Sequence, residues 1–311
     1  MNLTTPQVSI GMPVFNAERY IRQALDSLLA QDFKDFELVI SDNASEDRTQ
    51  DICLEYVARD KRIRYHQNQT NIGLDPNFRH VFQLSTAPYF TWASSDDTRH
   101  TEFLSSTVAI LDAEPQVVLC YSKVVLIDAA GEPIEPANDN LHIRLPDPAG
   151  RFRKCIWSVT MGTPVHSLIR SDALKKSRPF GGFINSDLVL LAELSLQGEF
   201  HQVDRPLFFR RMHPDQAAKK VLQEKKPWVL DPTNRRRLNL RWSYACYQTI
   251  KVVKRAQLSR IEKVRLMLAV LRCFKTRHGQ RIKAELTTEL RSELKRLAKD
   301  WWQHRKRKAE T

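Results

Sequence analysis

Phe90-Thr91-Trp92-Ala93-Ser94-Ser95-Asp96-Asp97-Thr98 is an apolar, β-favouring run that stops abruptly at two adjacent carboxylates. A buried strand that ends in carboxylates presents them at the C-terminal edge of its sheet, where open α/β sheets bind ligands. Hard oxygen ligands there suit Mg²⁺ or Mn²⁺ and, through the ion, a phosphate-bearing substrate. The pair alone is equally compatible with a solvated turn that caps the next helix, because Asp is a good N-cap residue. The rest of the chain has to decide between them.

Strands alternate with helices on the N-terminal side of this run. Val8–Val14 is predicted to be a buried strand, and the helix that follows it has Ile21, Leu25 and Leu28 at helical spacing. The unit repeats with a second apolar run at Phe36–Ile40 and a further helix. This alternation predicts an α/β fold with a doubly wound, mostly parallel, Rossmann-like sheet covered on both faces.

The composition narrows the class of protein. The chain has 311 residues and 42% hydrophobic content, enough for a real core. Its five cysteines are widely spaced and form no CxxC pair, which argues against a disulfide framework and a zinc site and favours a reducing compartment. The sequence shows neither a signal peptide nor a run of ~20 apolar residues. We therefore expect a cytoplasmic protein, with the inner face of a membrane as a possible place of peripheral attachment.

The net charge of +13 belongs to the C-terminal part of the chain. Residues 232–311 hold 23 Lys and Arg against 6 Asp and Glu, whereas the remainder holds 26 against 30. Helices are predicted over Leu238–Val253, Leu258–Phe274 and Ile282–Trp302. We expect a basic helical region at 232–311, joined to the body by a linker at 218–231. An acidic partner such as anionic lipid would bind this region and not the body.

Four motifs occur in a specific order and spacing. They are Pro13-Val14-Phe15-Asn16, Ser41-Asp42-Asn43-Ala44-Ser45, Asn71-Ile72-Gly73 and Ser95-Asp96-Asp97. In these motifs, and more weakly through residue 217, the chain resembles the family-2 glycosyltransferases of the GT-A fold. The resemblance implies inverting transfer of a sugar from a nucleotide-diphosphate donor, with a UDP-sugar expected, to an acceptor hydroxyl. It also implies a GT-A domain at 1–217, with a nucleotide-sugar half at 1–127 and an acceptor half at 128–217.

The resemblance assigns a divalent cation, Mg²⁺ or Mn²⁺, to Asp96, Asp97 and His213. Such a cation would stabilise the negative charge that develops on the leaving diphosphate. The family usually has a further carboxylate at the position of Ser94, and serine offers no full charge there. His213 matches a histidine that often closes on the metal or diphosphate, although a lone histidine is as often structural.

The resemblance also implies a donor-binding set near the first two strands. Asp42 matches a carboxylate that accepts a hydrogen bond from the nucleotide base, and it could equally cap the following helix. Pro13 and Phe15 match positions that flank the base, although a Phe after a first strand is more often part of the core. Asn16 and Asn77 complete this predicted substrate-binding set.

Asp187 matches the catalytic base of the family, which takes the proton from the attacking acceptor hydroxyl. The family commonly has Glu-Asp here and this chain has Ser186-Asp187, so only the second residue carries the match. A carboxylate favoured by the helix dipole is the alternative. Arg210 and Arg211, just before His213, add phosphate-binding capacity.

Two other functions compete with glycosyl transfer. A sugar nucleotidyltransferase would open with a glycine-rich phosphate loop, whereas only Gly11 is present near the first strand. A nucleic-acid- or membrane-binding protein would act through the basic tail and its tryptophans. Nucleic acid is the less favoured partner, because the basic residues share amphipathic helices with apolar stripes. We therefore predict a metal-dependent glycosyltransferase that acts in polysaccharide, glycolipid or glycan biosynthesis.

Overall fold

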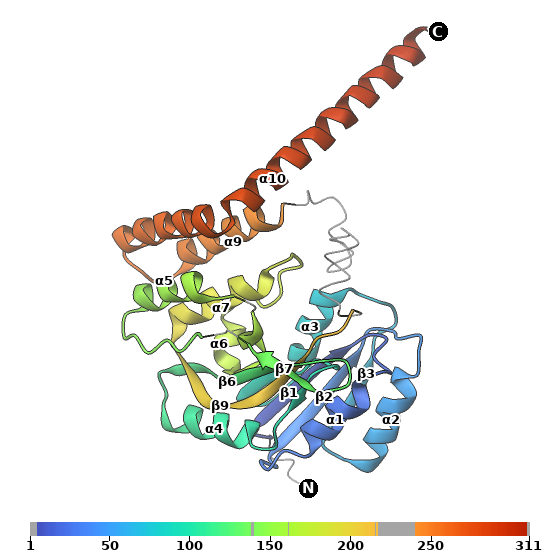
Figure 1. Ribbon diagram of the computed structural model, residues 1–311, viewed down its shortest axis with the longest axis vertical. Coiled ribbons are helices and arrows are strands. Elements are labelled where there is room, and N and C mark those ends of the chain that lie inside the picture. Colours follow the sequence, from blue (N-terminus) through green and yellow to red (C-terminus); the bar gives the residue numbers. More distant parts are fainter. Residues whose placement is uncertain (1–4, 138–139, 161, 215, 217–239, 310–311) are drawn as a thin grey trace. The chain divides into compact units, whose positions relative to one another are not determined.

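A single mixed sheet organises the N-terminal part of the structure (Figure 1). The computed structural model describes residues 5–137, 140–160, 162–214, 216 and 240–309. It divides into two compact units, Met1–Asn234 and Arg235–Thr311. The predicted linker at 218–231 lies outside the described residues.

The elements of the first unit alternate as the sequence predicts through its N-terminal half. The strands are β1 (Val8–Val14), β2 (Phe36–Asp42), β3 (Ile63–Gln67), β4 (Tyr89–Trp92), β5 (Thr98–Arg99), β6 (Val117–Ile127), β7 (Pro133–Pro136), β8 (Leu168–Arg170) and β9 (Glu199–Arg211). The helices are α1 (Ile21–Leu29), α2 (Thr49–Arg59), α3 (Leu74–Gln83), α4 (Phe103–Ala113), α5 (Pro148–Ser158), the short 3₁₀ helix η1 (Thr163–His166), α6 (Ser171–Lys175) and α7 (Ser186–Gln197).

The strand order is β3-β2-β1-β4-β8-β6-β9-β5, and β7 pairs with β6. Neighbours among β1, β2, β3 and β4 are parallel, as are β6 and β9, whereas β8 runs antiparallel to β4 and β6. The carboxyl ends of the parallel strands therefore meet at one edge. This mostly parallel α/β architecture with C-terminal helices confirms the predicted fold class.

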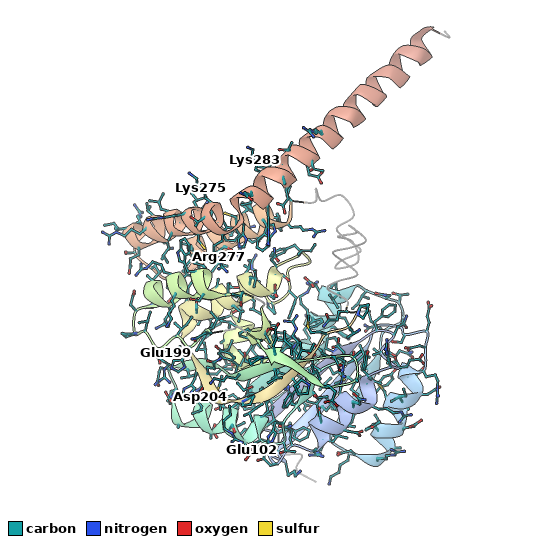
Figure 2. All side chains as sticks on the ribbon, viewed as in Figure 1. Glu102, Glu199, Asp204, Lys275, Arg277 and Lys283 are labelled. Atoms are coloured by element: carbon teal, nitrogen blue, oxygen red, sulfur yellow. The ribbon has the colours of Figure 1, made fainter. Side chains whose placement is uncertain are left out.

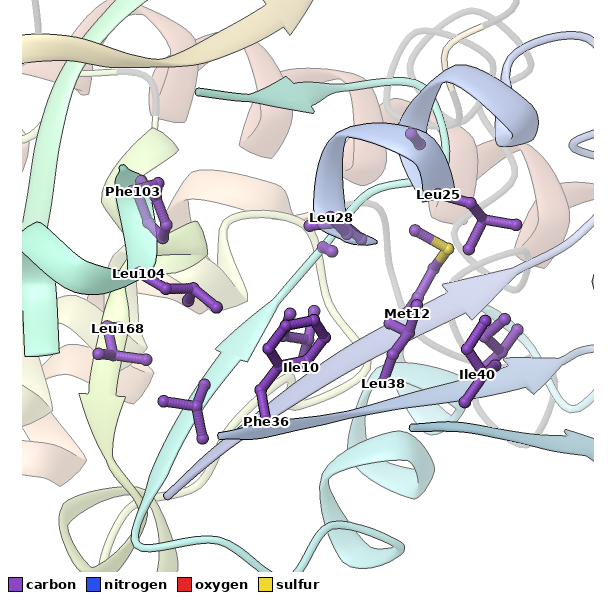
Figure 3. Packing of buried hydrophobic residues seen from close by; sticks show 14 of the residues in the cluster. Ile10, Met12, Leu25, Leu28, Phe36, Leu38, Ile40, Phe103, Leu104 and Leu168 are labelled. Atoms are coloured by element: carbon purple, nitrogen blue, oxygen red, sulfur yellow. The ribbon is translucent and has the colours of Figure 1, made fainter. Parts of the chain in front are cut away.

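Two hydrophobic cores cover the two faces of the sheet. Alternate residues of β1 and β2, including Ile10 and Leu38, face the core formed with α1, α2 and α4 (Figure 3). Val39 and Trp92 face the other core, which α3, α5, α6 and α7 close. Because β1 and β2 are buried along their whole length, the polar groups that follow them are held in place at the sheet edge.

Gly11 is fixed in β1 by a close approach and not by its backbone angle. A Cβ atom added here would lie 2.6 Å from the ring carbon Cζ of Phe90 on the neighbouring strand. That ring packs edge-on against Trp92, with centroids 4.8 Å apart. The absent side chain therefore lets β1 and β4 lie together under an aromatic layer.

The second unit is a helical hairpin of α9 (Arg241–Arg255) and α10 (Arg260–Ala309). The Trp242 ring stacks on His278 at 3.7 Å, so the start of α9 lies beside the middle of α10. The prediction of a break between 274 and 282 is wrong, because α10 is continuous. A lone Gly279 costs a helix only ~1 kcal/mol, which the flanking turns outweigh. Within the described residues, no helix combines the length and apolarity that crossing a bilayer requires.

Candidate active site

The two carboxylates that follow β4 lie beside the residues that end β9. β5 pairs antiparallel with β9, with Thr98 opposite Phe209. This register places Oδ2 of Asp96 2.9 Å from Nε2 of His213. It also lets the backbone N–H of Arg211 donate to Oδ1 of Asp97 at 2.8 Å. Residues more than a hundred positions apart thus meet at this edge of the sheet.

The adjacent carboxylates have different surroundings. Asp97 is buried, and its carboxylate accepts hydrogen bonds from the Arg211 backbone and the Ser94 side chain. Burial, together with the negative charge of Asp96, raises the pKa of Asp97. The Asp96 side chain keeps 24% of its surface exposed. Asp96 is therefore the carboxylate that can meet a ligand, and Asp97 with Ser94 supports it from inside.

Arg211 is committed to contacts within the protein. Its Nε donates to the backbone oxygen of Asp96 at 2.8 Å, and Nη2 donates to Oε1 of Gln23 at 2.7 Å. Nη1 donates to the carbonyl oxygens of Asp128 and Ala129, both at 3.2 Å. With 1% of its surface exposed, Arg211 braces the Asp96 loop. Its predicted phosphate-binding role stays a prediction.

Tyr20 packs over this cluster, although sequence reasoning did not select it. Its ring centroid lies 4.8 Å from that of His213, and the Arg211 guanidinium carbon lies 4.8 Å above the ring. Its hydroxyl is buried and has no hydrogen-bond partner among the described residues. In the sequence Tyr20 reads only as one more apolar residue at the start of a helix.

A cation could be held here only in part by the protein. Across the described ranges, no three His, Cys, Asp or Glu side chains group closely enough to hold a metal by themselves. Asp96 and His213 supply one carboxylate and one imidazole side by side. Mg²⁺ and Mn²⁺ on phosphate substrates commonly take one or two protein carboxylates, with phosphate oxygens and water as the other ligands. The pair therefore fits a cation shared with a diphosphate.

Asp187 lies in the first turn of α7, against the start of η1. A Cβ atom added to Gly162 would lie 2.2 Å from Oδ2 of Asp187, and Gly162 has a φ of +67°. The positive φ favours glycine, and a side chain here would push the Asp187 carboxylate away from the backbone. The next residue, Thr163, accepts a hydrogen bond from Nη1 of Arg210 at 3.0 Å. Since Arg210 precedes Arg211 in β9, this contact connects the Asp187 region to the Asp96 cluster.

Helix α3 holds the loop that leads into α7. Oδ2 of Asp75 accepts hydrogen bonds from the backbone N–H of Gly182 at 2.8 Å and from Oγ of Ser186 at 3.1 Å. Arg79, one turn further on, donates to a backbone carbonyl of the same loop. Burial raises the pKa of Asp75 to about 7, and the negative charge of Asp187 adds to the rise. Asp75 therefore holds, through Gly182 and Ser186, the backbone that leads into Asp187.

Asp42, at the end of β2, is surrounded by donors from the protein. Oδ1 accepts from the backbone N–H and the hydroxyl of Ser45, at 3.0 and 2.6 Å. Oδ2 accepts from the Tyr65 hydroxyl at 2.6 Å. The residue is fully buried. This geometry supplies the turn-capping role directly, and contact with a nucleotide base stays a prediction.

The other residues predicted to bind the nucleotide-sugar donor are partly buried and partly exposed. Pro13 is buried in β1, and Asn77 is buried in α3, where its amide exchanges hydrogen bonds with Ser41 at 2.6 and 2.9 Å. Asn16 accepts from the backbone of Glu46 at 2.9 Å and has a φ of 49°. Phe15, by contrast, is 46% exposed. Phe15 is thus the member of this set with a free apolar surface at the sheet edge.

The profile of glycosyl transferase family 2 matches residues 9–178, more than half of the chain. The chain belongs to glycosyl transferase family 2. An uncharacterized glycosyltransferase of Rickettsia typhi is 29% identical over 173 residues, which are 56% of this chain and 51% of the relative. The chain spans about half the length of the first relatives that it matches.

Solved structures share the fold of this family member. TarS of Staphylococcus aureus (residues 1–349), in complex with UDP-GlcNAc, has a TM-score of 0.65 at 16% identity and covers 87% of this chain and 73% of its own. The mannosyltransferase PcManGT of Pyrobaculum calidifontis, in complex with GDP-Man and Mn²⁺, has a TM-score of 0.50 at 14% identity. The match covers 94% of this chain and 88% of PcManGT. Both likenesses support the GT-A architecture.

The family match ends before two parts of the candidate site. Asp187 and His213 lie beyond residue 178, so contacts within the structure, and not the family profile, connect them to Asp96. Asp75 lies inside the matched range, yet an acidic residue in the first turn of a helix reads as a routine dipole contact. Its full burial, which the sequence does not reveal, is what distinguishes it.

Proposed function

We propose that this family 2 protein transfers a sugar, with inversion, from a nucleotide-diphosphate donor to an acceptor hydroxyl. One observation carries the proposal: the Asp96–His213 pair and the Asp187 region converge on one edge of the sheet through Arg210 and Thr163. A donor diphosphate at the pair would place its sugar toward Asp187. We expect a UDP-sugar donor, consistent with the UDP-GlcNAc complex of the structural neighbour TarS.

Asp187 is the proposed general base. A single displacement needs one carboxylate, which accepts the proton from the acceptor hydroxyl as that oxygen attacks the anomeric carbon. Gly162 keeps the space in front of the carboxylate free of side chain. Asp75 and Arg79 fix the loop before α7, so the base is held on a rigid element and not on a free loop.

Asp96 and His213 are the proposed holders of Mg²⁺ or Mn²⁺. When bound, the cation would neutralise the charge that develops on the leaving diphosphate. Asp97 holds Arg211 and is itself held by Ser94, so the loop that carries Asp96 stays in one position. Ser94, which stands where the family usually has a carboxylate, thus brings one negative charge fewer and still supports Asp97 through a hydrogen bond.

Phe15 and Asp42 are the residues that we propose to lie beside the nucleotide base of the donor. The exposed ring of Phe15 offers a stacking surface, and Asp42 with Asn77 fixes the loops around it. Family membership favours sugar transfer over sugar-nucleotide synthesis. We expect the product to belong to polysaccharide, glycolipid or glycan assembly.

A donor panel tests the proposal. UDP-, GDP- and dTDP-sugars are each incubated with the full chain in Mn²⁺, in Mg²⁺ and with chelator, and nucleotide release and donor binding are measured. We expect one donor class to bind, with release that chelator abolishes. Absence of binding and of release with every nucleotide sugar would overturn the proposal. Metal-independent release would retain the transferase and overturn the role of Asp96 and His213.

A further inference from the structure

Helix α10 has apolar side chains on two opposite sides of its first turns. One side is buried and carries Leu266, Val270 and Cys273, all at most 1% exposed, and α10 contacts α9 within the hairpin. The other side is bare. Its four exposed residues are Ile261 (66%), Val264 (52%), Leu268 (61%) and Leu271 (50%). At 100° per residue these four fall on one stripe, here called the α10 stripe.

Positive charge surrounds the α10 stripe. Residues 260–283 include eight Lys and Arg and a single acidic residue, Glu262. The carboxylate of Glu262 accepts from the Ser259 hydroxyl at 2.6 Å, which caps the start of the helix. Arg265 and Arg272 lie along one flank of the stripe, and Lys275 and Lys283 follow further along α10, where Figure 2 labels them.

We propose that the α10 stripe docks on the surface of an anionic lipid bilayer. Aliphatic side chains in one row can enter the boundary between headgroups and acyl chains, while the flanking cations meet lipid phosphates. An exposed aliphatic row alone, or a row of cations alone, is common on helices. A half-exposed aliphatic row flanked by cations, with Glu262 as its one acidic neighbour held by the Ser259 cap, is the combination that an anionic interface complements.

Other occupants fit the same surface less well. A second copy would bring its own cations against these and would repel them. Single-stranded nucleic acid binds through aromatic side chains on which bases stack, and the α10 stripe has only aliphatic residues. Charge complementarity together with aliphatic exposure therefore selects lipid.

Vesicle co-sedimentation of the full chain tests the surface and requires no sugar transfer, so its outcome is independent of the proposed enzymatic function. Vesicles of phosphatidylcholine alone are compared with vesicles that also contain phosphatidylglycerol. We expect binding only to the anionic vesicles, weakened by salt. The Ile261→Ser/Leu268→Ser variant should lose about tenfold in affinity, and Arg265→Gln/Arg272→Gln should lose about fivefold for each charge removed.

Matched variants on the first unit control for general effects. Leu54 and Ile134 are 46% and 55% exposed, so Leu54→Ser/Ile134→Ser removes comparable apolar surface elsewhere. Lys61→Gln/Lys176→Gln removes two exposed charges elsewhere. Both controls should bind vesicles like the unaltered chain, and circular dichroism should show equal helix content in all variants.

Three outcomes would overturn the proposal. The first is failure of the unaltered chain to bind anionic vesicles. The second is unchanged vesicle binding by the Ile261→Ser/Leu268→Ser variant. The third is a dimer, seen by light scattering, that the Ile261→Ser/Leu268→Ser variant abolishes, because the stripe would then contact a second copy. RNA retention without vesicle binding would fall under the first outcome and name a different partner.

Discussion

Asp42 and Asp96 follow buried strands at the same edge of the sheet, yet their carboxylates have opposite surroundings. Asp42 is fully buried and takes three hydrogen bonds from Ser45 and Tyr65. The Asp96 side chain is 24% exposed and contacts His213. A carboxylate at a strand end is therefore not by itself a ligand site. A carboxylate whose oxygens already accept several hydrogen bonds from the protein has a structural role, whereas one with few such bonds can bind a ligand.

The largest expected effect concerns Asp187, the proposed general base. Asp187→Asn should lower the turnover number by about 10³-fold, because an amide cannot accept the proton of the acceptor. Donor affinity, measured by calorimetry, should not change. Asp172→Asn, at an exposed position in α6, is the control. Normal turnover in Asp187→Asn would remove Asp187 from the mechanism.

Asp42→Ala should act on stability first. Removing the acceptor of three hydrogen bonds should lower the free energy of unfolding by about 3 kcal/mol, measured by urea denaturation. Tyr65→Phe removes one of the three donors and should cost about 1 kcal/mol. If Asp42→Ala kept its stability and lost only donor affinity, Asp42 would join Asp96 as a ligand-facing group and the contrast between them would fail.

Asp96→Asn should show the reverse pattern. Loss of the charge beside His213 should reduce Mn²⁺-dependent turnover by about 100-fold. The urea midpoint should stay that of the unaltered chain, since the side chain is partly exposed and its main partner is His213. A large loss of stability with normal metal dependence would show instead that Asp96, like Asp42, has a structural role.

The last prediction concerns Asp75 and the pH dependence of the free energy of unfolding. Its pKa in the folded state is raised to about 7, above that of an unfolded Asp, so the folded state holds the proton more tightly. Stability should therefore fall as pH rises from about 4 to about 7 and remain lower above this window.

Asp75→Asn should flatten this slope, as followed by urea denaturation at a series of pH values. The amide oxygen can still accept from Gly182 and Ser186, so the fold is preserved. Asp97, whose pKa is shifted in the same direction, is present in both proteins and cancels in the comparison. An identical pH slope in the two proteins would show that Asp75 is charged throughout.

The sequence predicts those parts of the site that depend on local pattern. Strand ends at Asp42 and Asp96 follow from apolar runs that stop at polar residues, and the parallel sheet follows from strand–helix alternation. The contacts made by Arg211 do not follow, because they depend on the register between β5 and β9. Burial also escapes the sequence: Asp75 and Asp42 look like ordinary helix-capping residues until the structure shows what covers them.

The tail shows the same limit in another form. Amphipathic periodicity predicts helices and a basic face, but the pattern cannot say which apolar residues pack in the hairpin. Leu266 and Leu268 are indistinguishable in the sequence, and the structure leaves one buried and the other 61% exposed. The difference comes from tertiary packing, which amphipathic periodicity does not encode.

The late arrival of β9 has a consequence for the order of events during synthesis. The partners of Asp97 and Asp96 are supplied by Arg211 and His213, so the cluster closes only when the chain has been made beyond residue 213. A nascent chain made as far as residue 178 contains the range that the family profile matches but lacks Arg211 and His213. A ribosome-bound fragment of that length would expose the edge of β6 where β9 belongs. The contacts of Asp96 and Asp97 with His213 and Arg211 therefore form only in a chain that already includes β9.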